Sequence, residues 1–458
     1  MSRTPSSPPV VILGAGLTGL SAAYHLQGVP RVLVERAGAV GGKARSERVR
    51  GHTFDITGHW LHLRDPRMQA LVSQLFADDD GQGPGSTALE RIDRVTRVFS
   101  HGALLAYPFQ ANLHGLPLEI VQECLVELVA ARERAARGEG QAPATFEEFA
   151  VARFGKGIAR HFFVPYNTKL WGMNPDQLTA DWVSRFIPIP DAAQIIGGAI
   201  GLRQEGLGYN AHFLYPKTGG IDHLPKALRR AGVDGREDAE LLLETALEEL
   251  DVAGRRVKLT GEGDWRDYGA LISSIPLPEL IKRTPGAPAE VREAARRLRW
   301  VRWRYLNVGT RAPVPVDYHW VYVPELRYPF FRVGVFSNAV SSMAPRGRAS
   351  LYVELNEREG PVDERAVAAA LAEIGAVRRV EDIAFMDIRE GEYAYVVFDD
   401  AYASSTKTIH DWLARVGVRS CGRYGAWIYN SMEDSMIQGL EAAGWAKDQV
   451  VAVAGGGG

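Results

Sequence analysis

The chain has 458 residues, of which 46% are hydrophobic and 24% charged, and its formal net charge is −2. This length predicts two or three structural modules, and the near-neutral charge excludes the basic field of a nucleic-acid-binding protein. The only two cysteines, Cys124 and Cys421, stand far apart, which excludes a disulfide framework or structural zinc site and favours a cytoplasmic protein. No run of about twenty apolar residues is present that could span a bilayer.

The first predicted element is a dinucleotide-binding turn. The apolar run Val10–Leu13 predicts a strand buried on both faces. Gly14, Gly16 and Gly19 then complete a G-x-G-x-x-G pattern ahead of a stretch with helical spacing. Such glycines permit a tight turn, close approach of the backbone to a pyrophosphate, and close packing of helix on strand. The first-turn N–H groups and the helix dipole then face the phosphates.

A second predicted strand, Arg31–Glu35, follows the helix and ends in an acid. Glu35 comes about 20 residues after Gly14, where dinucleotide-binding folds place the carboxylate that binds a ribose hydroxyl. The alternative, a packing turn in an unrelated α/β domain, leaves Glu35 without a purpose. We therefore predict that the turn and Glu35 bind a dinucleotide.

The segment "AGAVGGKARSERVRGHTFDITGHWLH" follows this acid directly. Its G-G-x-x-R pattern and its apolar stretch ending in Asp resemble the flavin-binding opening shared by monoamine oxidases, protoporphyrinogen oxidases and UDP-galactopyranose mutases. The resemblance implies FAD as cofactor, with its pyrophosphate contacted by Gly41, Gly42, Lys43, Ala44 and Arg45. No second G-x-G-x-x-G follows a strand, so no separate NAD(P)H domain is predicted.

The rest of the chain predicts an α/β protein in which a Rossmann-like FAD-binding domain is discontinuous. Residues 118–136 and 144–155 predict a helical insertion, 241–280 short strands that return to the nucleotide domain, and 300–400 a mixed sheet flooring a substrate chamber. The predicted pieces are 1–65 (FAD-binding), 66–214 (helical, substrate-binding), 215–285 (FAD-binding), 286–414 (substrate-binding sheet) and 415–458 (FAD-binding and tail).

Two segments resemble substrate and flavin loops of the mutases. The first, "TGHWLH", resembles their histidine-bearing loop and implies that His59 lies against the flavin, although a lone histidine is more often a core residue. The second, "YPFQANL", resembles the run that holds the uridine end of the substrate in eukaryotic-type mutases. It implies substrate contacts for Tyr107 and Gln110, with Arg94 as a further arginine upstream. The alternative is a turn with packed aromatics, which needs no glutamine.

A third segment, "FFVPYNTKLWGMNPDQLTADWVSRFIP", resembles the helix–loop–helix at the substrate mouth of these enzymes. Asn167, Trp171 and Trp182 match its spacing. Arg185 stands one position earlier than the family's arginine, and one residue of helix rotates a side chain by about 100°, so its reach to the site stays open. Asn210 is assigned to the same substrate site.

The last resemblance covers "HWVYVPELRYPFFRVGVFSN" and "GRYGAWIYNSMEDSMIQGLEAA", residues 319–338 and 422–443. It implies that Arg332 and Arg423 bind the two phosphates of a nucleotide sugar. Arginine suits a diphosphate because its planar fork binds phosphate oxygens bidentately and stays charged. The alternative is a pair of surface salt bridges. The same resemblance assigns the substrate contacts Trp320, Tyr322, Tyr395 and Tyr429, and the cofactor contact Met436.

One position departs from the pattern. The tyrosine that commonly follows F-S-N in the family is Ala339 here. One hydroxyl near the sugar or phosphate is therefore absent.

The resemblance spans nearly the whole chain and implies a mutase that interconverts the pyranose and furanose forms of a nucleotide sugar, most simply UDP-galactose. N5 of reduced FAD would be the nucleophile, Arg332 and Arg423 would hold the diphosphate, and His59 would tune the flavin. The alternative is an FAD-dependent oxidoreductase that takes hydride from an amine or a ring-reduced substrate. A third possibility, a flavoprotein that only senses, has no positive support. No metal, nucleic-acid partner or oligomeric state is predicted.

Overall fold

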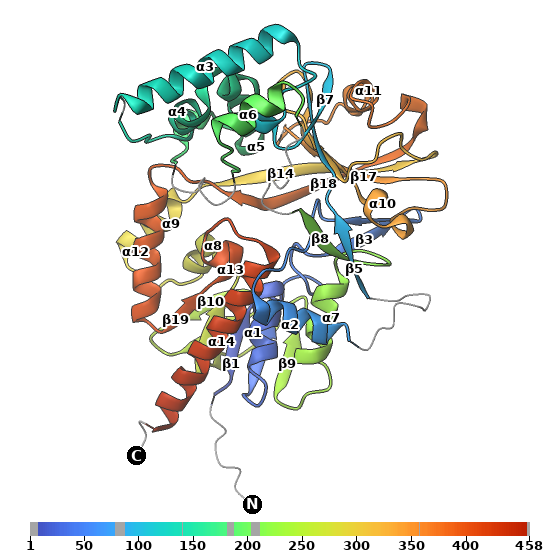
Figure 1. Ribbon diagram of the computed structural model, residues 1–458. Helices are drawn as coiled ribbons and strands as arrows, with labels where there is room; N and C mark the ends of the chain where they lie inside the picture. The colour runs from blue at the N-terminus through green and yellow to red at the C-terminus, as the bar shows by residue number, and fades with distance from the viewer. Residues whose placement is uncertain are drawn as a thin grey trace, which may run out of the picture.

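The computed structural model describes residues 8–77, 88–139, 141–180, 187–202, 211–356 and 358–455. A parallel five-stranded sheet lies in the lower half of the molecule in Figure 1, with strand order β19-β13-β1-β2-β9. Its strands are β1 (Val10–Leu13), β2 (Arg31–Val34), β9 (Ala239–Leu242), β13 (Ala270–Ser273) and β19 (Val418–Ser420). Because they come from three distant stretches of chain, the predicted discontinuous nucleotide-binding fold is confirmed.

Helices and small sheets surround this parallel sheet. The helix α1 packs against both α7 and α14, and both ends of the chain lie at the bottom of the view in Figure 1. The elements are α1 (Leu17–His25), α2 (Pro66–Leu75), α7 (His223–Gly232), α13 (Gly422–Gly425), α14 (Met432–Gly455), the hairpin β3 (Ser46–Val49) and β4 (His52–Asp55), the pair β5 (Leu89–Asp93) and β8 (His212–Pro216), and the sheet β10 (Leu247–Asp251), β11 (Arg256–Leu259) and β12 (Arg266–Asp267). The predicted boundary between residues 214 and 215 falls inside β8.

A mixed seven-stranded sheet lies above the nucleotide-binding fold, with order β18-β14-β17-β16-β15-β6-β7. It is antiparallel except where β15 runs parallel to β6. Its strands are β6 (Thr96–Ser100), β7 (Ala103–Ala106), β14 (Trp300–Thr310), β15 (Trp320–Tyr322), β16 (Phe330–Val335), β17 (Ser350–Leu355) and β18 (Ile383–Val396). The pattern of residues 378–402 predicts a further strand or two, and β18 is one strand of 14 residues.

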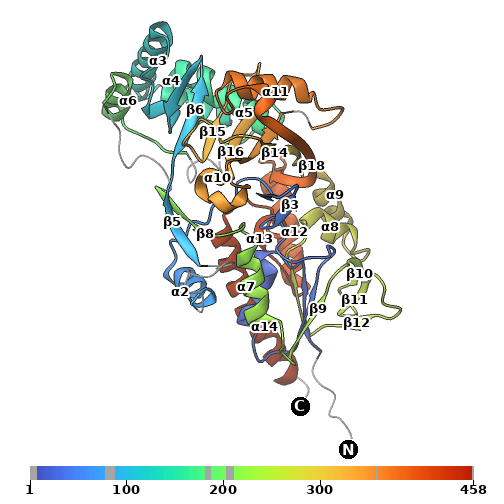
Figure 2. The same ribbon diagram turned by 90° about the vertical axis from the view of Figure 1, so that its right-hand side faces the viewer.

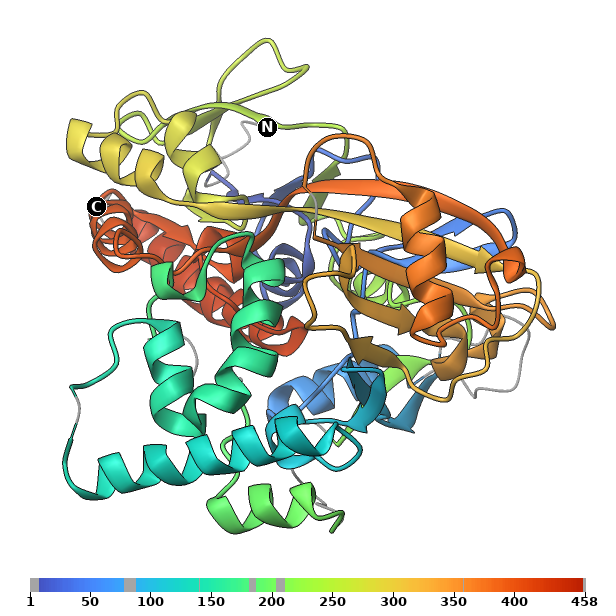
Figure 3. The ribbon, with the colours of Figure 1, turned by 90° about the horizontal axis from the view of Figure 1, so that it is seen from above.

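A layer of helices covers the far side of the seven-stranded sheet, as Figure 1 shows from the side and Figure 3 from above. It contains α3 (Leu118–Ala136), α4 (Phe146–Ile158), a π-helical turn (Ala159–Phe163), α5 (Val164–Trp171) and α6 (Ala192–Ala199). Thr145 and Glu148 form a capping box at the start of α4, which satisfies otherwise unpaired backbone donors. The predicted helical insertion is therefore confirmed.

The remaining helices lie around the two large sheets (Figure 2). They are α8 (Leu277–Lys282), α9 (Ala289–Arg297), α10 (Phe336–Ala339), α11 (Glu364–Glu373) and α12 (Tyr402–Arg415). The helices α9 and α12 pack together. Among the described residues, no helix is both long and apolar enough to cross a membrane.

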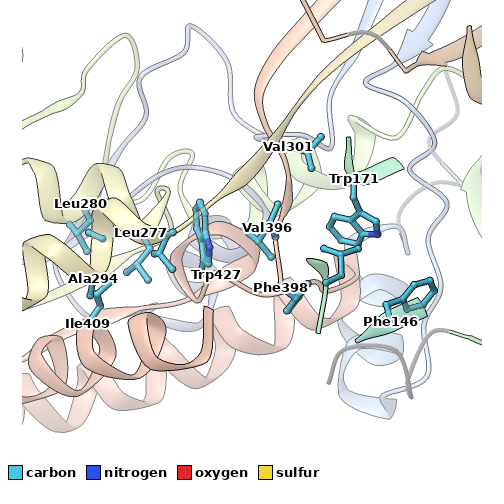
Figure 4. Close-up of a cluster of buried hydrophobic side chains, with 14 of the residues drawn as sticks. Phe146, Trp171, Leu277, Leu280, Ala294, Val301, Val396, Phe398, Ile409 and Trp427 are labelled. Carbon is cyan, nitrogen blue, oxygen red and sulfur yellow. The ribbon is translucent and has the colours of Figure 1, made fainter. Parts of the chain in front are cut away.

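One hydrophobic cluster extends from α8, α9 and α12 to the helical layer above the seven-stranded sheet. In Figure 4, Leu277, Leu280, Ala294 and Ile409 lie near the fully buried Trp427, and Val301 and Val396 on β14 and β18 continue the cluster toward Trp171. Each fully buried large apolar side chain contributes about 1.5–3 kcal/mol. This shared core ties the seven-stranded sheet to the nucleotide-binding fold.

Gly444 offers a test of the helix α14 in which a small change of stability is expected. It lies exposed within α14, and a Cβ added there meets nothing within 4 Å. Gly444→Ala is therefore expected to raise the free energy of unfolding by about 0.5–1 kcal/mol, because alanine loses less backbone entropy in a helix. Urea denaturation of the two proteins measures it, and a destabilised variant would contradict this placement of the helix.

Candidate active site

The glycine turn joins β1 to α1 in the geometry that its pattern predicts. Gly14 has a φ of 96°, a left-handed conformation that disfavours any residue with a Cβ. A Cβ on Gly19 would lie 1.9 Å from the carbonyl oxygen of Gly14, so only glycine lets the helix pack this close to the strand. The backbone N–H groups of Ala15 and Ala37 each donate to the Glu35 carboxylate at 2.9 Å. Glu35 therefore lies at the turn, with lone pairs left for a further donor.

A second glycine pair lies opposite the turn. Gly41 forms a parallel bridge with Gly16, and the Gly41 N–H donates to the Ala15 carbonyl at 2.8 Å. A Cβ on Gly42 would lie 3.2 Å from the Gly16 Cα. No described side chain caps the N-terminus of α1, so its first-turn donors point into this narrow space. An uncapped helix N-terminus beside bare backbone suits a phosphate group.

Lys43 lies beside this turn in a group of positive charges. The Lys43 ammonium lies 4.9 Å from the Trp303 ring centroid. Burial lowers its pKa to about 8, helped by repulsion from Arg45, Arg36 and Arg423. Such an accumulation of positive charge calls for an anion. The residues present therefore fit the pyrophosphate of a dinucleotide.

Ala44 and Met436 take buried positions near this turn. Ala44 is 3% exposed, and its N–H donates to the Gly41 carbonyl at 2.9 Å. Met436 on α14 is fully buried, and its carbonyl oxygen accepts from the Ser21 hydroxyl of α1 at 2.7 Å. Its side chain lies in the core that α1 shares with α14. A cofactor contact for Met436 stays a prediction.

Arg332 lies on β16, on the face of the seven-stranded sheet that looks toward the nucleotide-binding fold. Its cross-strand partners are Tyr322 on β15 and Glu354 on β17, and paired residues share one face of a sheet. The Arg332 Nε donates to Glu354, whose side chain is only 3% exposed, and one Nη donates to the Tyr395 hydroxyl at 3.3 Å. Burial works to lower the pKa of Arg332, but the charge of Glu354 outweighs it and the pKa rises.

Arg423 lies on the other side of Tyr395. Its guanidinium lies 5.4 Å from the Tyr395 ring and 4.6 Å from the Tyr429 ring, and those two rings stack at 6.0 Å. It donates to the carbonyl oxygens of Asn430 at 2.8 Å and Ala394 at 3.4 Å. Within the described part of the chain, Arg423 has no carboxylate partner. The structure therefore brings Arg332, Tyr395, Arg423 and Tyr429 together.

His59 lies on a strained loop next to both arginines. Thr57, two residues earlier, has a φ of 56°, which is unusual for a β-branched residue and typical of functional loops. Burial, together with the charges of Arg423 and Arg332, lowers the pKa of His59 to about 4. Its Nδ1 is buried and finds no hydrogen-bond partner among the residues described. His59 is therefore a neutral imidazole at pH 7, held near the backbone of Ile56 and Thr57.

An aromatic wall extends from Arg332 to the mouth of the site. The Tyr107 ring lies 5.5 Å from the Tyr322 ring, and the Arg94 guanidinium lies 5.2 Å from Tyr107 and 5.8 Å from Trp320. Trp320 stacks on Trp60 at 5.7 Å with an interplanar angle of 12°. This wall offers flat apolar faces beside a cation, as the recognition of a nucleobase or sugar requires.

Three predicted substrate residues already have partners in the structure. The Gln110 amide donates to the Pro188 carbonyl at 2.7 Å. Asn167 donates to the Phe163 carbonyl at 2.8 Å and accepts from the Trp171 indole at 3.1 Å. Trp171 also lies 5.7 Å from Tyr395, which places it against the arginine pair. Arg185, Trp182 and Asn210 lie outside the described residues, so their assignments stay predictions.

Sequence reasoning missed several residues on the same face of the sheet. Glu354 and Tyr352 come from β17, whose residues pair with Arg332 and Gly334 on β16. Trp303 on β14 faces Lys43. An alternation of polar and apolar positions along each strand is the only local signal for them, and it gives no strand register.

Three histidines with strongly lowered pKa values predict the response of the fold to acid. Burial lowers the pKa of His59, His62 and His319 from 6.5 to about 4. The unfolded chain therefore binds more protons than the folded chain between pH 6.5 and 4, and stability falls as the pH falls through that window. Asp55 has the opposite sign, because burial raises its pKa to about 7.

The three imidazoles outnumber Asp55, so we expect the free energy of unfolding to drop from pH 6.5 to pH 4.5. His319 accepts from the Val95 N–H at 3.0 Å through Nδ1, and protonation at that atom breaks the bond. Denaturation at a series of pH values checks this, with His319→Gln expected to show a shallower fall. A stability that is flat or rising on acidification would contradict it.

The chain is similar in sequence and in fold to several known proteins. Residues 17–443 match the family described as flavin containing amine oxidoreductase. A crystal structure of reduced UDP-galactopyranose mutase superposes with a TM-score of 0.86 at 27% identity, over 98% of this chain and 96% of that one. A probable UDP-galactopyranose mutase of Klebsiella pneumoniae is 26% identical over 38% of this chain and 44% of its own. The human peroxisomal N(1)-acetyl-spermine/spermidine oxidase is 29% identical over 27% of this chain and 24% of its own. The matched stretches thus span less than half of each curated relative.

Proposed function

The chain belongs to the flavin-containing amine oxidoreductase family and is a flavoenzyme with FAD as its cofactor; from this premise we propose that it interconverts the pyranose and furanose forms of a nucleotide sugar, most simply UDP-galactose. The observation that carries the proposal is the arrangement of Arg332 and Arg423 on either side of Tyr395, next to His59. The overall likeness to a UDP-galactopyranose mutase supports it. We place the enzyme in the cytoplasm, consistent with two buried, unbonded cysteines.

The arginine pair suits a reaction in which a diphosphate leaves and returns. A departing diphosphate carries negative charge that the pocket must hold until the sugar recloses. Among the described residues, Arg423 donates to two backbone carbonyls and contacts Tyr424 but no carboxylate, so its charge stays available for a phosphate. Arg332 is fixed in place by Glu354 and presents its remaining N–H groups beside Tyr395.

The tyrosines of the site contribute phenol groups that stay protonated and donate hydrogen bonds. Burial raises the pKa of Tyr395 and of Tyr107, so both phenols stay protonated at neutral pH and donate hydrogen bonds. Neutral His59 adds no charge to the site but orients a hydrogen bond. When bound, reduced FAD supplies the nucleophile for the anomeric carbon. The protein's part is to position the sugar, hold the diphosphate and exclude water.

The second candidate function is amine or ring oxidation, and the 29% identity to a spermine/spermidine oxidase favours it. The charges of this site argue against an amine. A protonated amine is repelled by the neighbouring charges of Lys43 and Arg423, whereas a diphosphate is attracted. The mutase is therefore our first proposal and the oxidase the second.

The proposal is tested with the purified holoenzyme after reduction by dithionite without oxygen. UDP-galactofuranose is supplied, and UDP-galactopyranose is sought by chromatography. The oxidised enzyme in air is tested in parallel for oxygen consumption with spermidine and cyclohexylamine. Ring conversion by reduced enzyme supports the mutase; oxygen consumption with an amine and no conversion would transfer the assignment to the oxidase.

A further inference from the structure

Tyr352 on β17 occupies a slot that two glycines leave open. The residue is fully buried. A Cβ on Gly334 would lie 1.9 Å from its ring, and a Cβ on Gly58 would lie 2.4 Å from its hydroxyl oxygen. The ring therefore crosses β16 where that strand has no side chain, and its hydroxyl reaches the backbone next to His59.

Among the described residues, the Tyr352 hydroxyl finds no acceptor for its proton. It is buried, and the side chain that interacts with its oxygen is the indole of Trp60. The indole N–H of Trp60 lies on the same side of Gly58, but an indole nitrogen donates only and cannot accept the phenol proton. A buried, unsatisfied hydroxyl costs about as much as a lost hydrogen bond, so this one is expected to meet an acceptor in the complete complex.

The hydroxyl lies in the same part of the site as the arginine pair. Tyr352 and Glu354 are two residues apart on one strand, on the face that carries Arg332 and Trp320. Burial raises the pKa of Tyr352, while Arg332 acts to lower it. The group therefore stays a phenol and a donor, beside a cation suited to an anionic ligand.

Tyr352 also lies close to the position where the family's usual hydroxyl is absent. Phe336, the first residue of α10, contacts the Tyr352 ring at 4.9 Å. Ala339, the last residue of α10, packs against the hydrophobic cluster that contains Tyr352, Trp60 and Trp320. The Tyr352 hydroxyl, which comes from β17, therefore lies in the region where α10 provides no hydroxyl group.

We propose that Tyr352 is a substrate-binding residue whose hydroxyl donates to an oxygen of the sugar–diphosphate part of the substrate, in place of the hydroxyl that Ala339 lacks. This inference rests on the proposed function, since it assumes a nucleotide sugar in the cleft. It adds a specificity-determining contact that Arg332, Arg423 and the other tyrosines do not supply.

The test compares binding of UDP and of UDP-galactose to wild-type holoenzyme and to Tyr352→Phe, followed by quenching of tryptophan fluorescence. The variant keeps the ring and removes only the hydroxyl, and we expect it to bind UDP-galactose between about threefold and thirtyfold more weakly. Tyr318→Phe is the matched control, because Tyr318 is also fully buried with an unpaired hydroxyl but lies in a different hydrophobic cluster. We expect it to bind as the wild type does.

Thermal melting separates a binding role from a structural one. Tyr318→Phe removes an unpaired buried hydroxyl. Tyr352→Phe removes a hydroxyl whose proton has no described acceptor and whose oxygen interacts only weakly with the Trp60 indole, so neither variant is expected to melt more than slightly below the wild type. Weaker binding of both ligands assigns the contact to the diphosphate, and weaker binding of UDP-galactose alone assigns it to the sugar. Unchanged binding of both by Tyr352→Phe overturns this inference alone, whereas a wild type that binds neither ligand overturns the proposed function with it.

Discussion

Arg332→Ala is expected to lower the free energy of unfolding by about 3–5 kcal/mol and to abolish measurable UDP binding. The first effect arises because Glu354, at 3% side-chain exposure, loses its cationic partner inside the protein. The second arises because charge-assisted hydrogen bonds to phosphate contribute about 1.5–3 kcal/mol each. Urea denaturation measures the stability, and quenching of tryptophan fluorescence measures the binding.

A double variant separates the two effects. In Arg332→Ala with Glu354→Gln, no uncompensated charge stays buried, so most of the lost stability is expected to return. The UDP affinity is expected to stay low, because the guanidinium is still missing. A single variant that binds UDP within about twofold of the wild type would remove Arg332 from the substrate site; the twofold limit is well below the effect of one lost phosphate contact.

Gly19→Ala is expected to yield a protein with little or no bound flavin. The added Cβ would lie 1.9 Å from the Gly14 carbonyl oxygen, so α1 must move away from β1 and withdraw its N-terminal donors from the pyrophosphate. Overpacking of this kind costs about 3 kcal/mol at the upper end of its usual range. The ratio of absorbance at flavin and protein wavelengths measures the loss.

Gly444→Ala serves as the control for that experiment. Its Cβ meets no neighbouring atom, so the variant is expected to purify with the same flavin content as the wild type. Full flavin occupancy in Gly19→Ala would contradict the assignment of the glycine turn to the cofactor.

The nucleotide-binding half was predictable because its signals are local. Gly14, Gly16, Gly19 and Glu35 lie within one strand–turn–helix–strand unit, and the structure places them together. The helices α3 and α4 were predictable from periodicity alone. Arg332 and Arg423 came from the resemblance, not from spacing, since 91 positions of chain separate them in the sequence while Tyr395 joins them in space.

The residues that were missed depend on strand register. Tyr352 and Glu354 come to the site only because β17 pairs with β16 so that they lie opposite Gly334 and Arg332. A shift of one residue would turn both side chains to the other face. The full length of the single strand β18 was equally hard to predict, because its pairing with β14 is long-range and its residues do not alternate regularly between polar and apolar.

The central claim is that the chemistry needs reduced flavin but consumes no electrons. The most direct measurement counts UDP-galactopyranose formed per flavin after one stoichiometric reduction, without oxygen, while absorbance reports the redox state. We predict many product molecules per flavin, with the flavin still reduced at the end. Product that stops at one molecule per flavin, or flavin that the sugar reoxidises, would contradict the account.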